Sequence, residues 1–340
     1  MNVSLNGYFL ANPHTGSGQY TVHLLDQLPW LQVANPAAPL SNVGKLRWEQ
    51  LGWPRAAAKA RADILHCPYF ALPLRRRMPA VVTIHDLIPM VLPAYRGSTL
   101  VRAYTRLQAL ACRTAEAILV DSECSKRDVL RLLNIPAERV HVIYLGVDER
   151  FTPDASGERP LERPYVFYIG GWDVRKNVPA LIRAFEQIAP EDPDLVLAIA
   201  GQPGSASAMF PDLRAIAAPL GDRVRFLGRV SDEEKLALYR HAELFAFPSL
   251  YEGFGLDPLE ALACGCPVVS SNASSLPEIV GDAALLFDPR DEQALANAMR
   301  QALNDPEPLR TRGPEQAAKF RWQKTARETA AIYEGIPITR

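Results

Sequence analysis

The chain has 340 residues, 48% of them hydrophobic and 22% charged, and its formal net charge is −1. At about 150 residues per domain, this length indicates roughly two domains. The composition excludes a disordered or fibrous chain, and the lack of a basic surplus argues against a nucleic-acid partner.

In the first half, short β-branched or Leu-rich runs alternate with amphipathic stretches, which is typical of parallel strands joined by helical crossovers. The predicted strands lie near residues 3–6, 64–66, 81–84, 118–121 and 140–143. The predicted helices lie near residues 18–28, 48–61, 99–113 and 126–133. Together they predict one doubly wound domain over residues 1–155.

Residues 151–160 interrupt this alternation with two prolines and a glycine, the composition of an interdomain linker. The alternation then restarts, with strands expected near residues 165–169, 195–200, 244–247 and 267–270. Asn177 is positioned to cap a helix over residues 178–188, and Ser231 with Glu234 predicts a capping box for a helix through His241. The sequence therefore predicts a second Rossmann-like domain over residues 156–318. A final helix within residues 319–340 could pack on either domain, and we assign it to the first.

The turn after the first strand is a candidate phosphate site. Gly16 and Gly18 would let backbone N–H groups approach a phosphate at a helix N-terminus. The third glycine of the dinucleotide fingerprint is missing, so a plain turn between strand and helix explains the pattern equally well.

The segment 251–260 is a second candidate, because two glycines and a helix start offer free N–H donors to an anion. Glu252 and Glu260 could bind sugar or ribose hydroxyls there. A structural alternative exists for the later residues: Asp257 as N-cap, Pro258 as the first helical residue and Glu260 as capping-box partner. Glu252 has no comparable structural role.

Charged side chains also follow other predicted strands. Arg175 and Lys176 precede Asn177, where two cations and a helix start favour anion binding; the alternative is a solvated basic pair. His85 ends a strand, where an imidazole can hydrogen-bond a sugar hydroxyl or relay a proton. His66 also ends a strand, and we expect a structural role for it.

Neither of two patterns with a superficial likeness to metal sites qualifies. Cys264 and Cys266 are separated by one residue, which is not a metal spacing, and we expect both in the core. Asp192 and Asp194 flank a proline and predict a turn. We therefore expect no metal site.

These motifs resemble the retaining glycosyltransferases of family 4, which have the GT-B architecture and are typified by bacterial cell-envelope mannosyl- and rhamnosyltransferases. The matching segments are 48–50, 83–86, 145–148, 175–177, 247–249, 252–255 with Glu260, and 275–278 with 281–284. The resemblance implies an α/β fold of two tandem Rossmann-like domains facing across a cleft, with the acceptor on the first and the donor on the second.

The resemblance also implies roles for single residues. Glu252 would lie beside the donor sugar, Glu260 would hold the ribose, and His85 would lie under the reacting sugar. The implied donor-binding set is Gly16, Gly18, Arg175, Lys176, Gly253, Phe254, Gly255, Leu256 and Glu260. Arg175 and Lys176 would neutralise the diphosphate, so that no metal or other cofactor is needed. Asp257 departs from the family pattern, in which an uncharged residue is common, and would weaken donor binding unless it caps the helix.

The implied activity is the transfer of a hexose from a nucleotide-diphosphate sugar to a hydroxyl of a saccharide or lipid-linked saccharide, with retention of configuration. GDP-mannose is the favoured donor, and cell-envelope polysaccharide or glycolipid synthesis the expected setting. Two alternatives stay open: a GT-B nucleotide-sugar epimerase, and a non-catalytic nucleotide-sugar-binding module.

The cysteine content and the distribution of charge predict where the protein is located in the cell. Five cysteines and the lack of a secretory pattern predict a cytoplasmic protein. Residues 1–150 contain 17 Lys and Arg against 11 Asp and Glu, including Arg75, Arg76 and Arg77 on a predicted loop. This surplus predicts peripheral contact with an anionic membrane at its inner face; the alternative is solvated arginines on helix faces.

Overall fold

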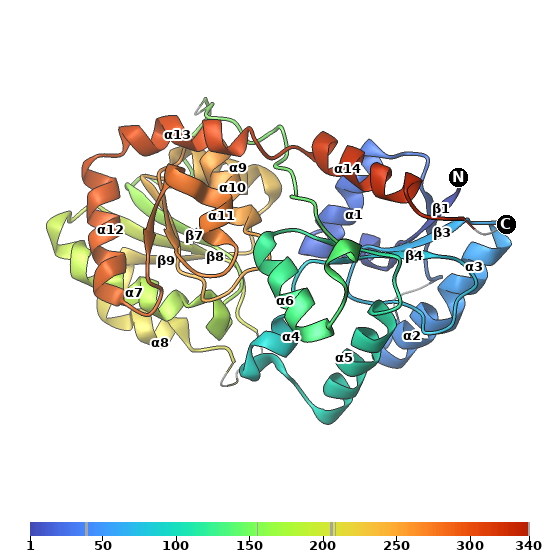
Figure 1. The fold of residues 1–340 in the computed structure, drawn as a ribbon. Coiled ribbons are helices and arrows are strands. Elements are labelled where there is room, and N and C mark those ends of the chain that lie inside the picture. Colours follow the sequence, from blue (N-terminus) through green and yellow to red (C-terminus); the bar gives the residue numbers. More distant parts are fainter. Residues whose placement is uncertain (38–39, 155, 205–206, 208, 339–340) are drawn as a thin grey trace. The chain divides into compact units, whose positions relative to one another are not determined.

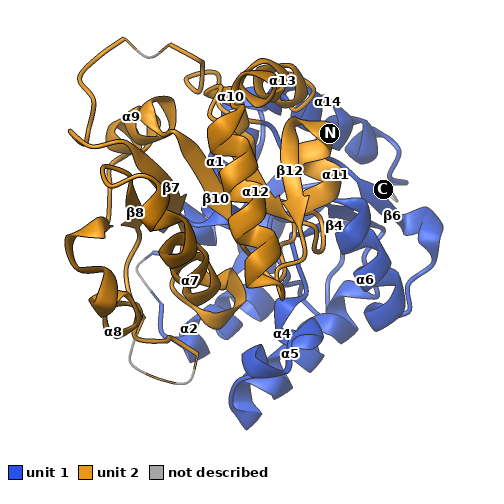
Figure 2. Cartoon of the chain, turned by 90° about the vertical axis from the view of Figure 1, so that its left-hand side faces the viewer, with its two compact units in different colours: residues 1–146, 321–340 blue, residues 147–320 orange. Residues whose placement is uncertain are grey.

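The computed structural model describes residues 1–37, 40–154, 156–204, 207 and 209–338. The chain forms two compact units, one of residues 1–146 with 321–340 and one of residues 147–320 (Figures 1 and 2). Each unit contains a parallel sheet with helical crossovers, so the predicted α/β class is confirmed. None of the described helices combines the length and apolar composition needed to cross a membrane.

The sheet of unit 1 has six parallel strands among the described residues, in the order β2-β1-β3-β4-β5-β6. They are β1 (Val3–Asn6), β2 (Gln32–Ala34), β3 (Ile64–Cys67), β4 (Ala80–Ile84), β5 (Ala117–Val120) and β6 (Val140–Val142). Strands β1, β3, β4 and β5 are buried throughout, as expected of strands covered on both faces. The sequence predicted all of these strands but β2.

The helices of unit 1 are α1 (Gly16–Gln27), α2 (Asn42–Arg47), α3 (Trp53–Lys59), α4 (Ile88–Val91), α5 (Thr99–Cys112), α6 (Glu123–Leu133) and α14 (Trp322–Glu334). The single helix predicted over residues 48–61 is wrong at its start, because Trp48–Gly52 forms a π-helical turn. That turn buries Glu49, whose carboxylate accepts hydrogen bonds from the Tyr104 hydroxyl and the Gln108 amide.

Helix α14 belongs to unit 1, where aromatic and polar contacts hold it. The Tyr333 hydroxyl lies 2.5 Å from His66 Nδ1, and Trp322 stacks on His23 with ring centres 4.4 Å apart. The other His66 nitrogen is 2.9 Å from the Thr83 hydroxyl. Burial lowers the pKa of His66 to about 3, so His66 is a neutral structural residue, as expected.

The sheet of unit 2 also has six parallel strands among the described residues, in the order β12-β11-β10-β7-β8-β9. They are β7 (Tyr165–Ile169), β8 (Val196–Ala200), β9 (Val224–Gly228), β10 (Leu244–Phe247), β11 (Val268–Ser271) and β12 (Ala284–Phe287). The chain leaves β7 toward one edge and β10 toward the other, so the strand order reverses between these two neighbours.

The helices of unit 2 are α7 (Val178–Ile188), α8 (Leu213–Ala217), α9 (Asp232–His241), α10 (Leu256–Ala263), α11 (Leu276–Val280), α12 (Glu292–Asn304) and α13 (Glu307–Ala317). The predicted capping box of Ser231 and Glu234 at the start of α9 is confirmed. The predicted side-chain cap at Asn177 is wrong: its amide instead donates to the carbonyls of Pro248 and Pro289, at 3.3 and 2.8 Å.

The chain passes from one unit to the other at residues 146/147 and 320/321, whereas the sequence placed the boundaries at 155/156 and 318/319. Residues 147–154 group with unit 2 because the Arg240 guanidinium donates to the carbonyls of Arg150 and Thr152. Phe151 also packs edge-on against Tyr239, with ring centres 6.0 Å apart. Ala155, at the predicted boundary, lies outside the described residues.

Two glycines at the start of α1 have different surroundings. The Thr15 hydroxyl caps the helix by accepting a hydrogen bond from the Gly18 N–H at 3.1 Å. A Cβ on Gly18 would lie 2.2 Å from the backbone oxygen of Asn12, whereas a Cβ on Gly16 would meet no atom within 4 Å. Gly18 is therefore required for packing, and Gly16 leaves open space.

We expect Gly18→Ala to lower the free energy of unfolding by about 1–3 kcal/mol, because backbone must move to relieve the clash. Gly16→Ala is the matched control, and we expect it to be neutral or to stabilise by about 0.5–1 kcal/mol, since alanine is the better helix former. Urea denaturation followed by circular dichroism measures both. Equal stability of the two variants would contradict this assignment.

Candidate active site

The loops after β7 and β10 come together at the point where the strand order of the second sheet reverses. In doubly wound sheets, ligands bind outside the carboxyl ends of the strands at such a point. Residues 170–177 follow β7 and residues 248–255 follow β10. The two loops are joined by backbone, since the Leu250 N–H donates to the Arg175 carbonyl at 2.8 Å.

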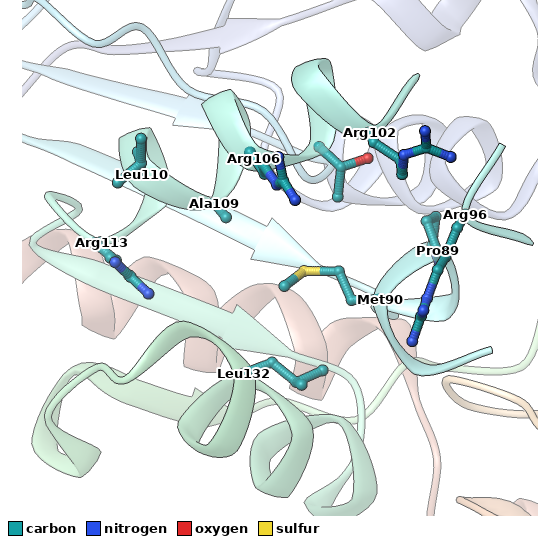
Figure 3. A pocket seen from close by; sticks show the side chains of 10 residues that line it. Pro89, Met90, Arg96, Arg102, Arg106, Ala109, Leu110, Arg113 and Leu132 are labelled. Atoms are coloured by element: carbon teal, nitrogen blue, oxygen red, sulfur yellow. The ribbon is translucent and has the colours of Figure 1, made fainter. Parts of the chain in front are cut away.

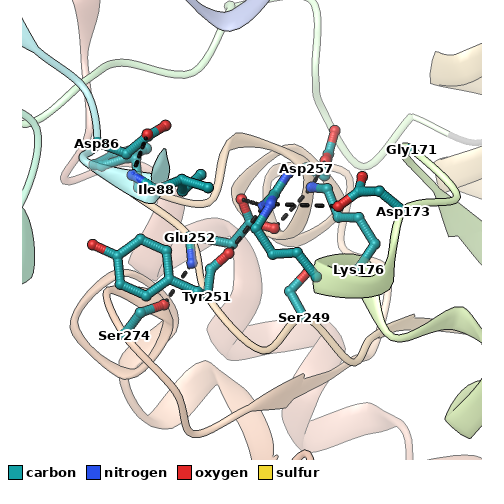
Figure 4. Close-up of polar contacts among 12 residues, drawn as sticks. Asp86, Ile88, Gly171, Asp173, Lys176, Ser249, Tyr251, Glu252, Asp257 and Ser274 are labelled. Carbon is teal, nitrogen blue, oxygen red and sulfur yellow. Dashed lines mark hydrogen bonds and ion pairs between the residues drawn. The ribbon is translucent and has the colours of Figure 1, made fainter. Parts of the chain in front are cut away.

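A buried ion cluster occupies this junction (Figure 4). Glu252 lies between two cations, with Oε2 2.7 Å from Arg175 Nη1 and Oε1 2.8 Å from Lys176 Nζ. The side chains of Arg175, Lys176 and Glu252 are only 14%, 10% and 12% exposed. The basic pair is therefore not a solvated one. The expectation that Glu252 has no structural role is wrong, because its carboxylate is the internal counter-ion of both cations.

Serine hydroxyls fix the loop that carries Glu252. The Glu252 N–H donates to the Ser274 hydroxyl at 2.7 Å, and the Ser275 hydroxyl is hydrogen-bonded to the carbonyls of Glu252 and Phe254. Gly255 ends the loop at φ 121°, a conformation that side-chain-bearing residues rarely adopt. Gly253 and Phe254 are buried with it, and Leu256 begins α10 directly afterwards.

The pKa values of the two carboxylates near Lys176 shift in opposite directions. Burial alone would raise the pKa of Glu252, but Lys176 and Arg175 outweigh it and hold that pKa below its usual range. Burial raises the pKa of Asp257, whose carboxylate lies 3.8 Å from Lys176 Nζ. Two carboxylates thus compete for Lys176, and Glu252 holds the closer position.

The helix-start interpretation of Asp257 and Glu260 is wrong. Gly255 is the N-cap residue of α10, and Asp257 lies inside the helix as its second residue. Glu260 is buried; its carboxylate lies 3.0 Å from Lys235 Nζ and accepts a hydrogen bond from the Tyr239 hydroxyl at 3.2 Å. Burial raises the pKa of Glu260 to about 7 despite Lys235. Both partners lie on α9, and nothing in the sequence singled them out.

His85, in unit 1, follows β4 and is held at both ring nitrogens. Nδ1 lies 2.6 Å from the Asp121 carboxylate and Nε2 lies 3.1 Å from the Pro68 carbonyl. Both partners are acceptors, so the doubly protonated imidazolium is the form that satisfies both contacts. Burial opposes that charge, but Asp121 raises the pKa of His85. The signal for this pair is that His85 and Asp121 each directly follow a buried apolar strand. The structure places those strands side by side, with Ile84 opposite Val120.

The structure also tests the two sequence patterns that have a superficial likeness to metal sites. Asp192 accepts the backbone N–H groups of Asp194 and Leu195, which makes the segment the predicted turn. All five cysteines are buried, Cys264 and Cys266 in the core as expected. Among the described residues, no three His, Cys, Asp or Glu side chains form a group that could hold a metal ion.

Comparison with known proteins identifies related families and folds. A model described as glycosyl transferases group 1 matches residues 150–320, and one described as glycosyltransferase family 4 matches residues 27–151. The O-antigen chain mannosyltransferase B of Escherichia coli is 32% identical over 375 residues, covering 95% of this chain and 96% of the relative.

Solved structures agree with this at the level of the fold. Sucrose-phosphate synthase from Thermosynechococcus elongatus aligns with a TM-score of 0.78 at 23% identity, covering 98% of both chains. HepE of Anabaena, solved with UDP-glucose, aligns with a TM-score of 0.75 at 20% identity, covering 99% of this chain and all of the other. The predicted GT-B fold is confirmed.

The contact between His85 and Asp121 predicts a specific pH dependence. A histidine whose pKa is raised by folding contributes stability that is complete below its unfolded pKa of about 6.5 and is lost as pH rises through the folded pKa. We expect Asp121→Asn to lower the free energy of unfolding by about 1–2 kcal/mol near pH 6, and by less near pH 9. Urea denaturation at both pH values measures this.

A proton NMR titration gives an independent readout, in which the pKa of His85 should fall in Asp121→Asn. His66, whose buried ring has a pKa of about 3, serves as the internal control and should not titrate near neutral pH in either protein. An unchanged His85 titration would show that Asp121 does not hold the imidazolium.

Proposed function

The chain belongs to the glycosyl transferases group 1, and on that premise we propose that it transfers a hexose from a nucleotide-diphosphate sugar to a hydroxyl of a saccharide or lipid-linked saccharide. The observation that carries the proposal is the buried ion cluster at the switch point of the second sheet. There Arg175 and Lys176 share the carboxylate of Glu252, at 2.7 and 2.8 Å, while Asp173 and Asp257 lie farther away, 3.7 Å from Arg175 and 3.8 Å from Lys176. A diphosphate is the ligand that such a cation pair suits.

Donor binding would rearrange the cluster. A diphosphate brought to Arg175 and Lys176 competes with Glu252 for both cations, so its arrival releases the Glu252 carboxylate toward the hydroxyls of the sugar. Backbone N–H groups of Gly255 and Leu256 at the start of α10 add further donors for the phosphates. In this proposal Glu252 is the counter-ion of the empty site and a sugar ligand of the occupied one.

Glu260 is the proposed ribose ligand. Its carboxylate retains acceptor capacity beyond the Lys235 ammonium and the Tyr239 hydroxyl, because an ionised carboxylate accepts about four hydrogen bonds. With a pKa of about 7, Glu260 gains charge across the neutral range, so the carboxylate accepts a ribose hydroxyl more strongly as pH rises.

Unit 1 is the proposed acceptor unit. His85 would lie under the reacting sugar as a fixed positive charge, because both of its nitrogens already donate to Asp121 and Pro68. Gly16 leaves space beside the start of α1 through which a phosphate could approach the backbone. The Gly18 N–H is occupied by the Thr15 cap, so its contribution is the close packing of the turn.

The transfer itself is proposed to retain the anomeric configuration. The bond between the anomeric carbon and the diphosphate oxygen breaks with its electron pair on the diphosphate, and a bond to the acceptor oxygen forms on the same face. The proton of the acceptor hydroxyl leaves with the nucleotide diphosphate. Arg175 and Lys176 stabilise the charge that develops on the leaving group, which is the task a divalent metal performs in other transferases. We accordingly propose a reaction that needs no metal.

Mannose is the proposed sugar and GDP-mannose the proposed donor, because the relative that matches 95% of the chain is a mannosyltransferase. That relative makes O-antigen chains, which supports a setting in cell-envelope polysaccharide or glycolipid synthesis. We place the enzyme in the cytoplasm, at the inner face of the membrane where a lipid-linked acceptor would be met.

A donor screen tests the proposal directly. A ligand at 100 times its Kd stabilises the native state by about 2.7 kcal/mol, so GDP-mannose should raise the melting temperature more than UDP-sugars do. Transfer to an added mannosyl acceptor then separates a transferase from an epimerase, which would convert the donor alone. Running that assay with EDTA tests the metal-free mechanism, because loss of transfer would overturn it.

Removal of one cation should be severe. We expect Lys176→Ala to lower kcat/KM for transfer by about 10²–10³, corresponding to roughly 2–4 kcal/mol of lost charge stabilisation. Lys319→Ala, which changes the same residue type at an exposed position of unit 2, is the control and should leave transfer unchanged. An unaltered kcat/KM in a folded Lys176→Ala protein would remove this lysine from the site.

Removal of the competing carboxylate should have the opposite effect on binding. We expect Asp257→Asn to tighten GDP binding about fivefold, because it removes a negative charge that lies 3.8 Å from Lys176. The repulsion between that charge and the diphosphate is worth about 1 kcal/mol. Asp222→Asn, on an exposed carboxylate of the same unit, is the control for net charge. Isothermal titration calorimetry measures both, and weaker GDP binding in Asp257→Asn would contradict the proposed place of the diphosphate.

A further inference from the structure

Unit 1 contains a cavity of about 520 Å³ that takes no part in the site described above. It is an open groove between α4, α5 and α6, and Figure 3 shows the side chains that line it. We call it the arginine groove, after the four arginines among its lining residues: Arg96, Arg102, Arg106 and Arg113.

The charge of the arginine groove is not neutralised. Residues 87–115 contain these four arginines and neither aspartate nor glutamate. All four are exposed, and no described residue forms an ion pair with any of them. Arg102 donates to the Gly97 carbonyl and the Thr99 hydroxyl, and Arg113 to the Leu133 carbonyl, all of them neutral acceptors.

Helical periodicity collects this charge on one side of α5. Arg102, Arg106 and Arg113 are spaced by four and seven residues, so they share one stripe of the helix. Arg96 approaches the same groove from the segment that precedes α5 (Figure 3). The result is a concentrated positive patch in a unit that contains 20 Lys and Arg against 11 Asp and Glu.

Apolar side chains are interleaved with the arginines. Met90, Leu110 and Leu132 line the groove together with Pro89 and Ala109. Leu110, which lies on α5 beside Arg106 and Arg113, is 54% exposed. Cations beside exposed aliphatic groups match a surface that is anionic and apolar at once.

We propose that the arginine groove docks unit 1 on the anionic surface of a lipid bilayer. The guanidinium groups bind lipid phosphates, and Leu110, one turn after Arg106, enters the apolar layer beneath the headgroups. The apolar side chains of the groove, Leu110 among them, favour a bilayer over a nucleic acid, which offers no aliphatic phase to receive them. This inference does not depend on the proposed transfer reaction.

The sequence-based candidate for membrane contact, the three adjacent arginines at residues 75–77, stays a prediction, and one of the three is already paired. Of the three adjacent arginines on the loop before β4, Arg76 pairs with Glu116 at 3.0 Å and donates to the Thr114 hydroxyl. Arg76 therefore fixes its own loop, and replacing all three arginines would perturb folding. None of the four arginines of the groove forms an ion pair with a carboxylate of the described residues.

Vesicle sedimentation with the full chain tests the proposal. The chain should sediment with vesicles of equimolar phosphatidylcholine and phosphatidylglycerol, less so with added salt, and should not sediment with phosphatidylcholine alone. Arg96→Gln with Arg106→Gln should weaken this partitioning roughly 30-fold, for two charges at an anionic surface. Neither side chain forms a hydrogen bond or ion pair among those found in the described residues, so the double variant should fold.

Matched variants keep the test specific. Arg55→Gln with Lys59→Gln removes the same charge from the exposed side of α3 and should retain vesicle binding, as should Arg96→Lys with Arg106→Lys. Equal losses in the α3 variant, sedimentation with neutral vesicles, or no sedimentation of the wild-type chain would overturn the proposal. So would groove-dependent binding of an RNA oligonucleotide without vesicle binding. GDP-induced thermal stabilisation of the same variants reports on the donor site separately, so failure of either proposal is distinguishable from failure of the other.

Discussion

The ion cluster of Arg175, Lys176 and Glu252 depends on one topological constraint, the reversal of strand order between β7 and β10. Because the chain leaves these neighbouring strands toward opposite edges, the loops that follow them meet instead of running side by side under helices. The two cations come from one loop and the carboxylate from the other. Two cations this deeply buried would each be destabilising by several kcal/mol if left unpaired. Glu252 from the second loop supplies the closest counter-ion to both, while Asp173 of the first loop lies 3.7 Å from Arg175 and Asp257 lies 3.8 Å from Lys176.

The same device appears in unit 1, where Asp121 holds His85 as an imidazolium at 2.6 Å. In both units a charged side chain of the proposed site is balanced by an internal group of opposite sign. Balancing has a consequence for binding: a ligand for such a site must compete with the internal partner, so affinity is lower than the bare charge would give. In exchange the charged group is held in place before the ligand arrives, and no reorganisation of solvent is needed.

How much the sequence predicts differs between the centre and the edge of each sheet. The strands β7 and β10 are predicted to the residue, because central parallel strands are continuous apolar runs. The three strands that were missed, β2, β9 and β12, all lie at sheet edges. An edge strand has one neighbour and partial cover, so polar residues such as Arg225 interrupt its pattern. Local capping was predicted where the motif is self-contained, at Ser231 and Glu234, and failed at Asn177, whose partners are 71 and 112 residues away.

The sequence and the structure differ most in which arginines they mark as available to a ligand. Three adjacent arginines at residues 75–77 are the most conspicuous basic motif in the chain, yet Arg76 is consumed by Glu116, which lies 40 residues further on. The four arginines of the groove are spread over 18 residues and form no run in the sequence. The helical repeat of α5 nevertheless aligns Arg102, Arg106 and Arg113, and residues 87–115 contain no acid. What decides whether a cation is available to a ligand is therefore the nearest carboxylate in space. A run of basic residues reports on that carboxylate only when the segment around it is free of acids, as residues 87–115 are.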